Sequence, residues 1–213
     1  MEDVQGGDHP EGEPDRLVRI AAAGDDRARL CLLEAHRDRL RRMVAVRLDR
    51  RIAARVDPSD VVQETLAEAA ASLSDYLRCP PLPFYPWLRQ IASDRIVELH
   101  RRHIGAGRRS VTREVAAGPG LPEASAQGLA DRLAHATSSP SRRAARDEER
   151  AMVRAAIDRL GPTDREILVL RHLEGLETDE IAALLGIRPD AVRARHVRAL
   201  ARLRSLFDRD PRE

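Results

Sequence analysis

The side chains with the clearest chemical potential lie near the C-terminus, where arginines recur along a predicted helix. They are Arg193, Arg195, Arg198, Arg202 and Arg204. Residues 191–204 contain no acid. Each guanidinium offers a planar fork of donors that matches phosphate oxygens and the edge of guanine. The segment therefore predicts a surface that binds a polyanion. All 37 cationic side chains of the chain are arginine and none is lysine, which a GC-rich genome explains best.

The charges are unevenly distributed along the 213 residues, although the formal net charge is only +2. Residues 1–15 hold six acids and no arginine. The remaining residues therefore carry 37 arginines against 29 acids, a net charge of +8. A basic body behind an acidic leader points to a polyanionic partner.

The elements that would position these arginines are predicted to form a helix-turn-helix. A short helix over residues 178–185 leads to Gly186, which permits a left-handed turn, and the next helix begins at Pro189. The apolar and small residues that would close the crossing are Ile181, Ala182, Leu185 and Val192. Such a motif can place its second helix in the major groove of DNA. A helical hairpin with a solvated basic face is the alternative, which the combined spacing of Ala, Gly and Val disfavours.

Composition and periodicity predict an all-α fold of two small helical domains joined by a flexible linker. Aromatic residues make up only 2% of the chain, so aliphatic side chains must form the cores, which favours helices over a β-sandwich. The expected parts are a disordered acidic leader (1–14), a first domain (15–104), the linker (105–141), a second domain (142–207) and a tail (208–213).

Hydrophobic spacing and breakers predict the helices of each domain. The expected elements are two helices separated at Gly24 before residue 50, then helices over about 58–78, 87–104, 142–160, 163–173, 178–185 and 189–207. Asp57 can cap the helix that has Pro58 in its first position. Four prolines predict a stiff extended loop, not helix, over residues 79–86.

Two pairs of motifs occur in a fixed order along the chain. Segments 160–171 and 175–186 resemble the fourth conserved domain of bacterial RNA polymerase sigma factors, and segments 57–66 and 84–92 resemble their second domain. No recognisable third domain lies between them, which is typical of the extracytoplasmic-function class. The resemblance implies a factor that has no activity alone and gives RNA polymerase its choice of promoter.

The resemblance also implies contacts with core polymerase, namely with the β′ clamp through the helix that begins at Asp57, and with the β flap. The polar residues available for the clamp are Asp57, Asp60, Gln63 and Glu64. Acidic side chains suit a basic partner, but a solvated acidic face would have the same pattern. An anti-sigma factor is a further partner that the family allows, and the residues leave open whether one exists.

By the same resemblance, the proline-rich loop and the helix after it open promoter DNA and read the minus 10 element. Unstacked bases need aromatic surfaces and phosphates need cations. The residues expected there are Phe84, Tyr85, Trp87, Arg89, Asp94, Arg95 and Arg101. Core packing is an equally good interpretation of Trp87. Asp94 and Glu98 depart from the family's usual Asn and Asp, and an aspartate can accept from cytosine N4, so the base preference is expected to differ.

The helix from Pro189 is expected to dock in the major groove of the minus 35 element. The residues that would touch phosphates or bases are Arg188, Arg193, Arg195, His196 and Arg198. A rival hypothesis is a homodimeric helix-turn-helix repressor or activator in which residues 15–104 sense or dimerise. A third hypothesis is a helical interaction module that does not bind nucleic acid. It leaves the basic helix without acidic residues unexplained.

Other classes of protein find little support in the residues. Cys31 and Cys79 match no zinc or redox spacing and are expected to be free thiols. His100 and His103 flank two arginines without further ligands, so no metal or other cofactor is expected. No nucleophile elbow, phosphate loop or paired-acid motif predicts an enzyme. Without a signal peptide, or an apolar run near the roughly 20 residues that cross a bilayer, the chain is expected to be cytoplasmic and not bound to a membrane.

Overall fold

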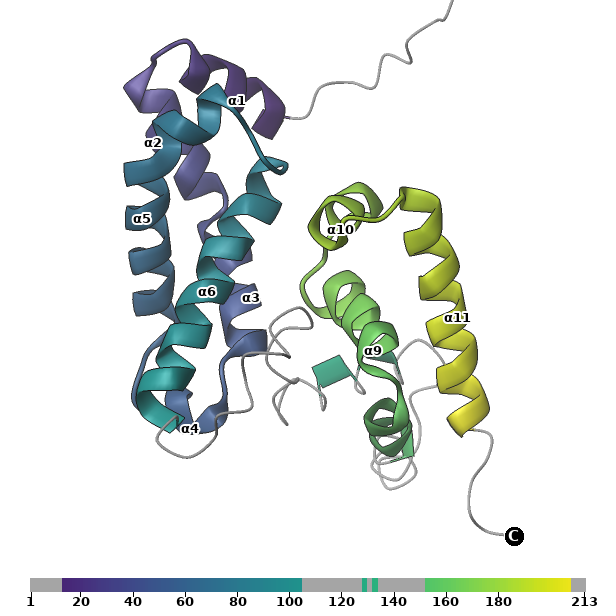
Figure 1. Ribbon diagram of the computed structural model, residues 1–213. Helices are drawn as coiled ribbons and strands as arrows, with labels where there is room; N and C mark the ends of the chain where they lie inside the picture. Colours follow the sequence, from purple (N-terminus) through teal and green to yellow (C-terminus); the bar gives the residue numbers. More distant parts are fainter. Residues whose placement is uncertain (1–12, 105–127, 130–131, 134–151, 208–213) are drawn as a thin grey trace, which may run out of the picture.

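The structure, a computed structural model, describes residues 13–104, 128–129, 132–133 and 152–207. Within these residues all regular structure is helical, which confirms the expected all-α fold. The helices form two units, coloured purple to teal and green to yellow in Figure 1. Most of the expected leader and linker, and the tail, lie outside the described residues.

The N-terminal unit is a bundle in which α3, α5 and α6 pack against one another. Its helices are α1 (Glu13–Ala22), α2 (Asp26–Ala35), α3 (Arg37–Arg47), α4 (Arg50–Ala53), α5 (Pro58–Arg78) and α6 (Phe84–Ile104). The largest fully buried side chains are Leu32, Leu40, Met43, Ile52, Leu88 and Ile96. Because α5 buries only the face that carries Val61, Leu66 and Leu73, its opposite face remains available to a partner.

The limits predicted for α5 are confirmed by its ends. Asp57 Oδ1 accepts a hydrogen bond from the backbone N–H of Ser59 at 2.7 Å, and Pro58 occupies the first helical position. At the other end Cys79 leaves the helical conformation after Arg78.

Two predictions of helix limits are wrong. The helix α6 begins at Phe84, not Trp87, so residues 84–86 belong to its first turn, where the N–H that Pro86 lacks needs no partner. The single helix expected after Gly24 is divided into α2 and α3 at His36, whose φ of −100° and ψ of −3° interrupt the regular turns.

The C-terminal unit follows the predicted order closely. It contains a helix over residues 152–159, α9 (Pro162–Leu168), the π-helical turn η3 (Val169–Leu173), α10 (Thr178–Leu185) and α11 (Pro189–Phe207). The limits predicted for α10 and α11 are confirmed, and Gly186 between them has a φ of +62°, in the left-handed region that glycine adopts without strain. Leu129, a residue of the expected linker, is fully buried in the core of this unit.

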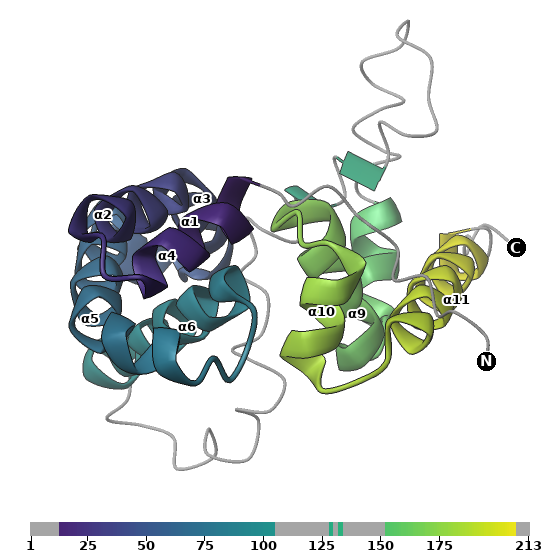
Figure 2. The ribbon, with the colours of Figure 1, turned by 90° about the horizontal axis from the view of Figure 1, so that it is seen from above.

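The two units pack against each other in the structure. Leu170, Leu176 and Ile181 of the C-terminal unit belong to the same buried cluster as the core of the N-terminal unit. The helix α10 contacts α6. Figure 2 shows from above that α10 lies on the side of its unit that faces the N-terminal unit. In both views α11 lies on the side of its unit that is turned away from the N-terminal unit (Figures 1 and 2).

Candidate nucleic-acid interface

The helix α11 presents its arginines on an open surface. Arg188, just before the helix, and Arg193 and Arg198 within it are exposed, while Arg195 and His196 are half-buried. Val192 and Ala199 are buried, which fixes the rotation of the helix on its unit. All five residues expected at the minus 35 element therefore lie on or next to one helix.

Acidic side chains hold some of these arginines. Arg193 Nη1 donates to Asp190 Oδ1 at 2.6 Å, and Arg188 lies 3.6 Å from the same carboxylate. Arg202 is bonded to Asp164 of α9. Among the described residues no ion pair involves Arg195 or Arg198. Arg195 and Arg198 can thus bind phosphates without first breaking an ion pair with a carboxylate.

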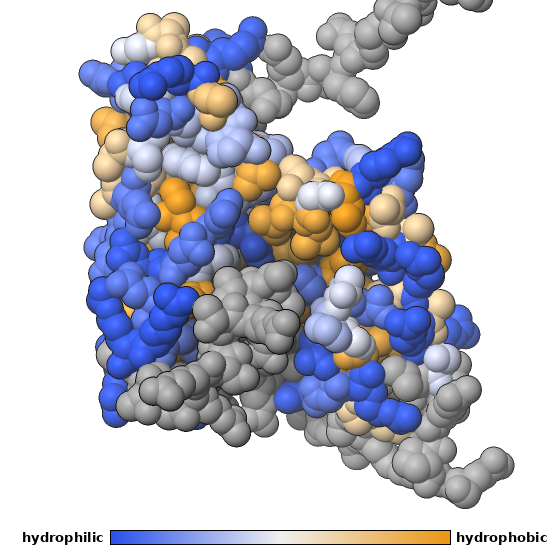
Figure 3. All heavy atoms as spheres, viewed as in Figure 1, coloured by the Kyte–Doolittle hydropathy of each residue, from blue (hydrophilic) through white to orange (hydrophobic). Residues whose placement is uncertain are grey.

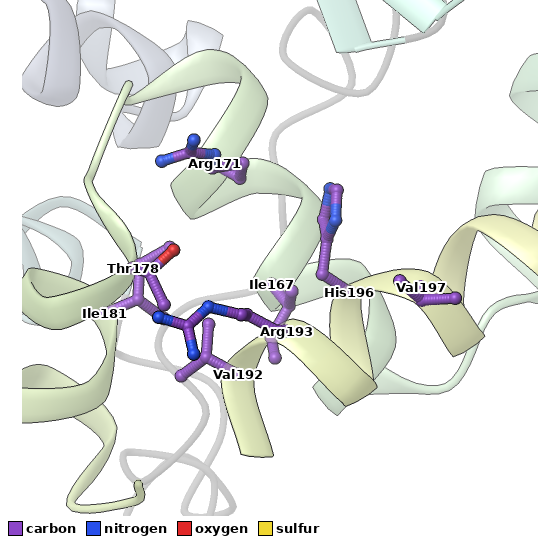
Figure 4. A pocket seen from close by; sticks show the side chains of 8 residues that line it. All are labelled: Ile167, Arg171, Thr178, Ile181, Val192, Arg193, His196 and Val197. Atoms are coloured by element: carbon purple, nitrogen blue, oxygen red, sulfur yellow. The ribbon is translucent and has the colours of Figure 1, made fainter. Parts of the chain in front are cut away.

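A hollow of about 360 Å³ lies between α9, η3, α10 and α11. Figure 4 shows the side chain of Arg193 extending toward Thr178 and Ile181 of α10. The hollow also has an apolar lining that includes Ile167 and Val192. The arrangement brings a cation of α11 beside the start of α10, the two elements that a helix-turn-helix sets against DNA.

Two histidines meet at the edge of this hollow. The Nε2 atoms of His172 and His196 are 2.9 Å apart, so one ring donates to the other and at least one is neutral. Burial, and then the positive charge of Arg171, lower the pKa of His196. Burial also lowers the pKa of His172, assisted by His196, Arg171 and Arg132. Sequence reasoning singled out His196 but missed His172, because no local spacing connects η3 with α11.

The aromatic residues expected to receive bases pack together inside the N-terminal unit. Phe84 is 7% exposed and Tyr85 only 2%. Trp87 is half-buried and stacks on Tyr76, with ring centroids 4.3 Å apart. The hydroxyl of Tyr76 donates to the carbonyl oxygen of Leu82 at 3.0 Å. Of the three aromatics expected at the minus 10 element, only Trp87 keeps part of its surface open in this conformation.

The charged residues of α6 occupy different surroundings. Arg95 lies among carboxylates, at 2.7 Å from Glu68 and 3.2 Å from Glu98, whereas Arg101 is exposed. Asp94 is exposed, yet partial burial and the charge of Glu68 raise its pKa. Arg89 is buried and bonded to Glu174 of the C-terminal unit. The residues expected at the minus 10 element therefore share one helix but not one open surface.

The residues expected to bind polymerase do share an open surface. Asp57, Asp60, Gln63 and Glu64 are all exposed at the N-terminal end of α5. Glu64 lies 3.6 Å from Arg95, whereas within the described part of the chain neither Asp57 nor Asp60 forms an ion pair.

The sequence did not predict the ion pairs at the junction of the two units, although it singled out Arg89 as a minus 10 residue. Arg39, Arg47 and Arg89 of the N-terminal unit face Glu166, Glu174 and Glu180 of the C-terminal unit. The partners are 85 to 141 residues apart in the sequence, so no local pattern could have paired them.

Two sequence expectations concern metals and membranes. Within the described part of the chain, no three side chains of the metal-binding types come together. The Nε2 of His100 is buried without a hydrogen-bond partner, and the side chain of His103 lies outside the described residues. None of the described helices combines the length and apolar character needed to cross a bilayer.

Comparison with known proteins matches both units. A family model described as Sigma-70, region 4 matches residues 150–203. The RNA polymerase sigma factor CnrH of Cupriavidus metallidurans is 32% identical over 154 residues, 72% of this chain and 75% of CnrH. The ECF RNA polymerase sigma factor ShbA of Streptomyces griseus is 30% identical over 90% of this chain and 94% of ShbA. A solved structure of CnrH in complex with the cytosolic domain of CnrY aligns with 93% of this chain and 99% of that chain, at 29% identity and a TM-score of 0.49.

Proposed function

The chain belongs to the RNA polymerase sigma factors of the extracytoplasmic-function class, and we propose how its two units divide the work of such a factor. As a sigma factor it serves core RNA polymerase in promoter recognition and transcription initiation. The homodimeric repressor or activator is not favoured, because relatives that span most of the chain are sigma factors. We therefore propose a regulatory, DNA-binding role in the cytoplasm, rather than an enzymatic one.

The C-terminal unit reads the minus 35 element through α11 in this proposal. The observation that carries it is the exposed arginine face of a helix that follows a left-handed glycine turn. Arg195 and Arg198 offer hydrogen-bond donors to phosphates or guanine. Arg188 and Arg193 can bind DNA once their ion pairs with Asp190 are broken. His196 lies on the same helix but is partly occupied by His172.

Run-off transcription with core polymerase on a library of genomic fragments would identify the promoter and test this assignment. With a promoter in hand, Arg198→Ala is expected to weaken binding by about 1 to 3 kcal/mol if the side chain contacts a base, or to lower the salt slope by about one if it contacts a phosphate. Arg27→Ala, which removes an exposed arginine of α2, is the matched control. Unchanged affinity and unchanged salt slope would show that α11 is not the reader.

The N-terminal unit binds the β′ clamp through the exposed face of α5. Support comes from the shared exposure of Asp57, Asp60, Gln63 and Glu64, whose charges suit a basic partner. The β flap is proposed as a second contact of the factor on polymerase, without residues assigned to it.

Charge reversal of one carboxylate tests the α5 assignment. Asp60→Arg is expected to weaken the complex with core polymerase while leaving helix content and binding of duplex DNA by α11 unchanged. Asp75→Arg, at an exposed position near the opposite end of α5, is the control. Normal competition by Asp60→Arg for core polymerase would contradict the clamp assignment.

We extend the proposal to promoter opening by the start of α6. Trp87, Asp94 and Arg101 have surface that can meet an opened strand in the observed conformation. Phe84, Tyr85 and Arg89 are buried and can contribute only after their surroundings change.

A further inference from the structure

The junction between the units contains a buried group of opposite charges. Glu174 accepts from Arg47 Nε at 2.6 Å and from Arg89 Nε at 2.5 Å. Its carboxylate has no exposed surface, and the side chains of Arg47 and Arg89 are 4% and 8% exposed. Arg47 also forms a two-pronged ion pair with Glu166, at 2.7 and 2.8 Å. Among the described residues, the charge partners of Glu174 thus all come from the other unit.

A second contact lies at the rim of the junction. Arg39 donates to the carboxylate of Glu180 at 2.8 Å and to the carbonyl oxygen of Gly175 at 3.1 Å. Its guanidinium also lies 3.6 Å from the centre of the Tyr85 ring. Arg39 therefore holds the start of α10 against the aromatic residues at the start of α6.

Apolar contacts continue around these charges. Leu176, Ile181 and Ala182 are buried in one cluster with the core of the N-terminal unit, and Val46 of α3 packs against the core of the C-terminal unit. Figure 3 shows hydrophobic side chains gathered over α10 beside the N-terminal unit. The junction therefore combines buried apolar contacts with buried charge pairs.

In these ion pairs the N-terminal unit supplies the positive charges and the C-terminal unit supplies the negative charges. All three arginines belong to α3 or α6, and all three glutamates to the segment from α9 to α10. We call Arg39, Arg47 and Arg89 the arginine surface, and Glu166, Glu174 and Glu180 the acidic edge. Guanidinium forks bind carboxylates and phosphates with the same donors, so the acidic edge occupies groups that would also suit a nucleic-acid strand.

We propose that the arginine surface is a docking surface with two alternative occupants, the acidic edge in the free protein and the phosphates of an opened DNA strand in the promoter complex. Docking of the acidic edge places Glu174 on Arg89, which is buried, whereas Arg193 and Arg198 of α11 stay exposed. The free protein can therefore meet duplex DNA through its C-terminal unit before it can hold a single strand. This inference rests on the proposed function for the part that Arg89 plays at the promoter.

Energy transfer between two dyes measures docking without DNA. One dye is placed on Cys31 of α2 and the other on Ser205→Cys at the end of α11, with Cys79→Ser to remove the second native thiol. Glu174→Gln removes the charge that pairs with Arg47 and Arg89, so transfer is expected to change toward a separated arrangement. Asp179→Asn makes the same charge change at an exposed position of α10 and is expected to match the wild type.

Binding of a fluorescent single-stranded oligothymidine to the full chain measures how far the arginine surface is exposed. If the competent form is only a small fraction of the free protein, Glu174→Gln is expected to bind about ten- to a hundredfold more tightly than the wild type. Adding Arg89→Ala to Glu174→Gln should reduce that gain. Glu180→Gln, at the half-buried rim, should shift both readings in the same direction and carries the test if Glu174→Gln loses helix content.

The outcomes separate this proposal from the function itself. Equal energy transfer in the wild type and in both junction variants overturns docking, and altered transfer with unchanged affinity for oligothymidine overturns masking. Run-off transcription by the wild type with core polymerase tests the proposed function, and its failure would leave the energy-transfer result standing.

Discussion

At the scale of single residues, the surroundings of Glu174 decide its behaviour. Burial acts to raise the pKa of its carboxyl, but the charges of Arg89 and Arg47, and the hydrogen bonds they donate, outweigh burial and hold the pKa below its ordinary value. A buried charge that loses its partners is costly, whereas a fully paired one is close to balanced. The intact ion pairs of Glu174 therefore add little to the free energy of unfolding. Removing its carboxylate is costly, because Arg47 and Arg89 would then be buried without a partner.

Glu174→Gln is expected to lower the free energy of unfolding at neutral pH by about 1 to 3 kcal/mol. This is less than the cost of breaking a buried ion pair, about 3 to 5 kcal/mol, because the units can part and let water reach Arg47 and Arg89. Since the folded pKa of Glu174 is depressed, its contribution is complete above the ordinary value of 4.5 and is lost as the pH falls through the lower folded value. Urea denaturation of both proteins should show their difference shrinking in acid, and a constant difference would contradict the pairing.

The contact between His172 and His196 predicts a second pH dependence. Both pKa values are lowered in the folded protein, so folding favours the neutral rings. The stability that follows is present above the ordinary pKa of 6.5 and is lost as the pH falls through the lower folded values. Imidazole signals in NMR should titrate below 6.5 for both rings. Titration of either ring above that value would rule out the neutral pair.

At the scale of helices, the sequence predicted those helix ends that are set by a capping residue, a glycine or a proline close by. Gly186 and Pro189 fix the turn between α10 and α11, and Asp57 with Pro58 fixes the start of α5, so these limits were readable from the sequence. The division at His36 was not readable, because leucines continue at helical spacing across it. The early start of α6 was missed because proline was weighed as a breaker, although a first turn tolerates it.

The aromatic residues at the start of α6 are expected to differ in role. Phe84 contacts the rings of Tyr76, His36 and Trp87, so Phe84→Ala should cost about 3 to 5 kcal/mol of stability, as for other large buried rings. Trp87→Ala should cost less because Trp87 is half-buried, yet it should reduce permanganate-reactive open promoter complexes. Thermal unfolding of the free proteins and permanganate footprinting provide the two measurements. If Trp87→Ala melts as early as Phe84→Ala, Trp87 is a structural residue.

At the scale of the whole molecule, the sequence predicted two units but not their contact. Hydrophobic periodicity records which face of a helix is buried, and it does not record which helix covers that face. The arginines of α11 could be predicted as a site because they are neighbours in one element. The arginine surface and the acidic edge could not, because their partners meet only after both units have folded.

The shared core predicts cooperative unfolding. Because buried residues of both units form one cluster, the wild type is expected to show a single calorimetric transition. Glu174→Gln should divide this transition into two, since weaker docking lets each unit unfold by itself. Two separate transitions in the wild type, at the temperatures seen in the variant, would show that the junction contributes nothing to stability.

The acidic edge and the arginine surface belong to one polypeptide, which gives the edge a fixed effective concentration at its docking site. Dilution cannot release it, and synthesis of more protein cannot saturate it, so the docked fraction is the same at every cellular level of the factor. A competing strand succeeds only when it too is delivered locally. In the proposed promoter complex, where α11 holds duplex DNA and α5 holds polymerase, the opened strand is a competitor of that kind. A stray single strand at low concentration would leave the protein closed.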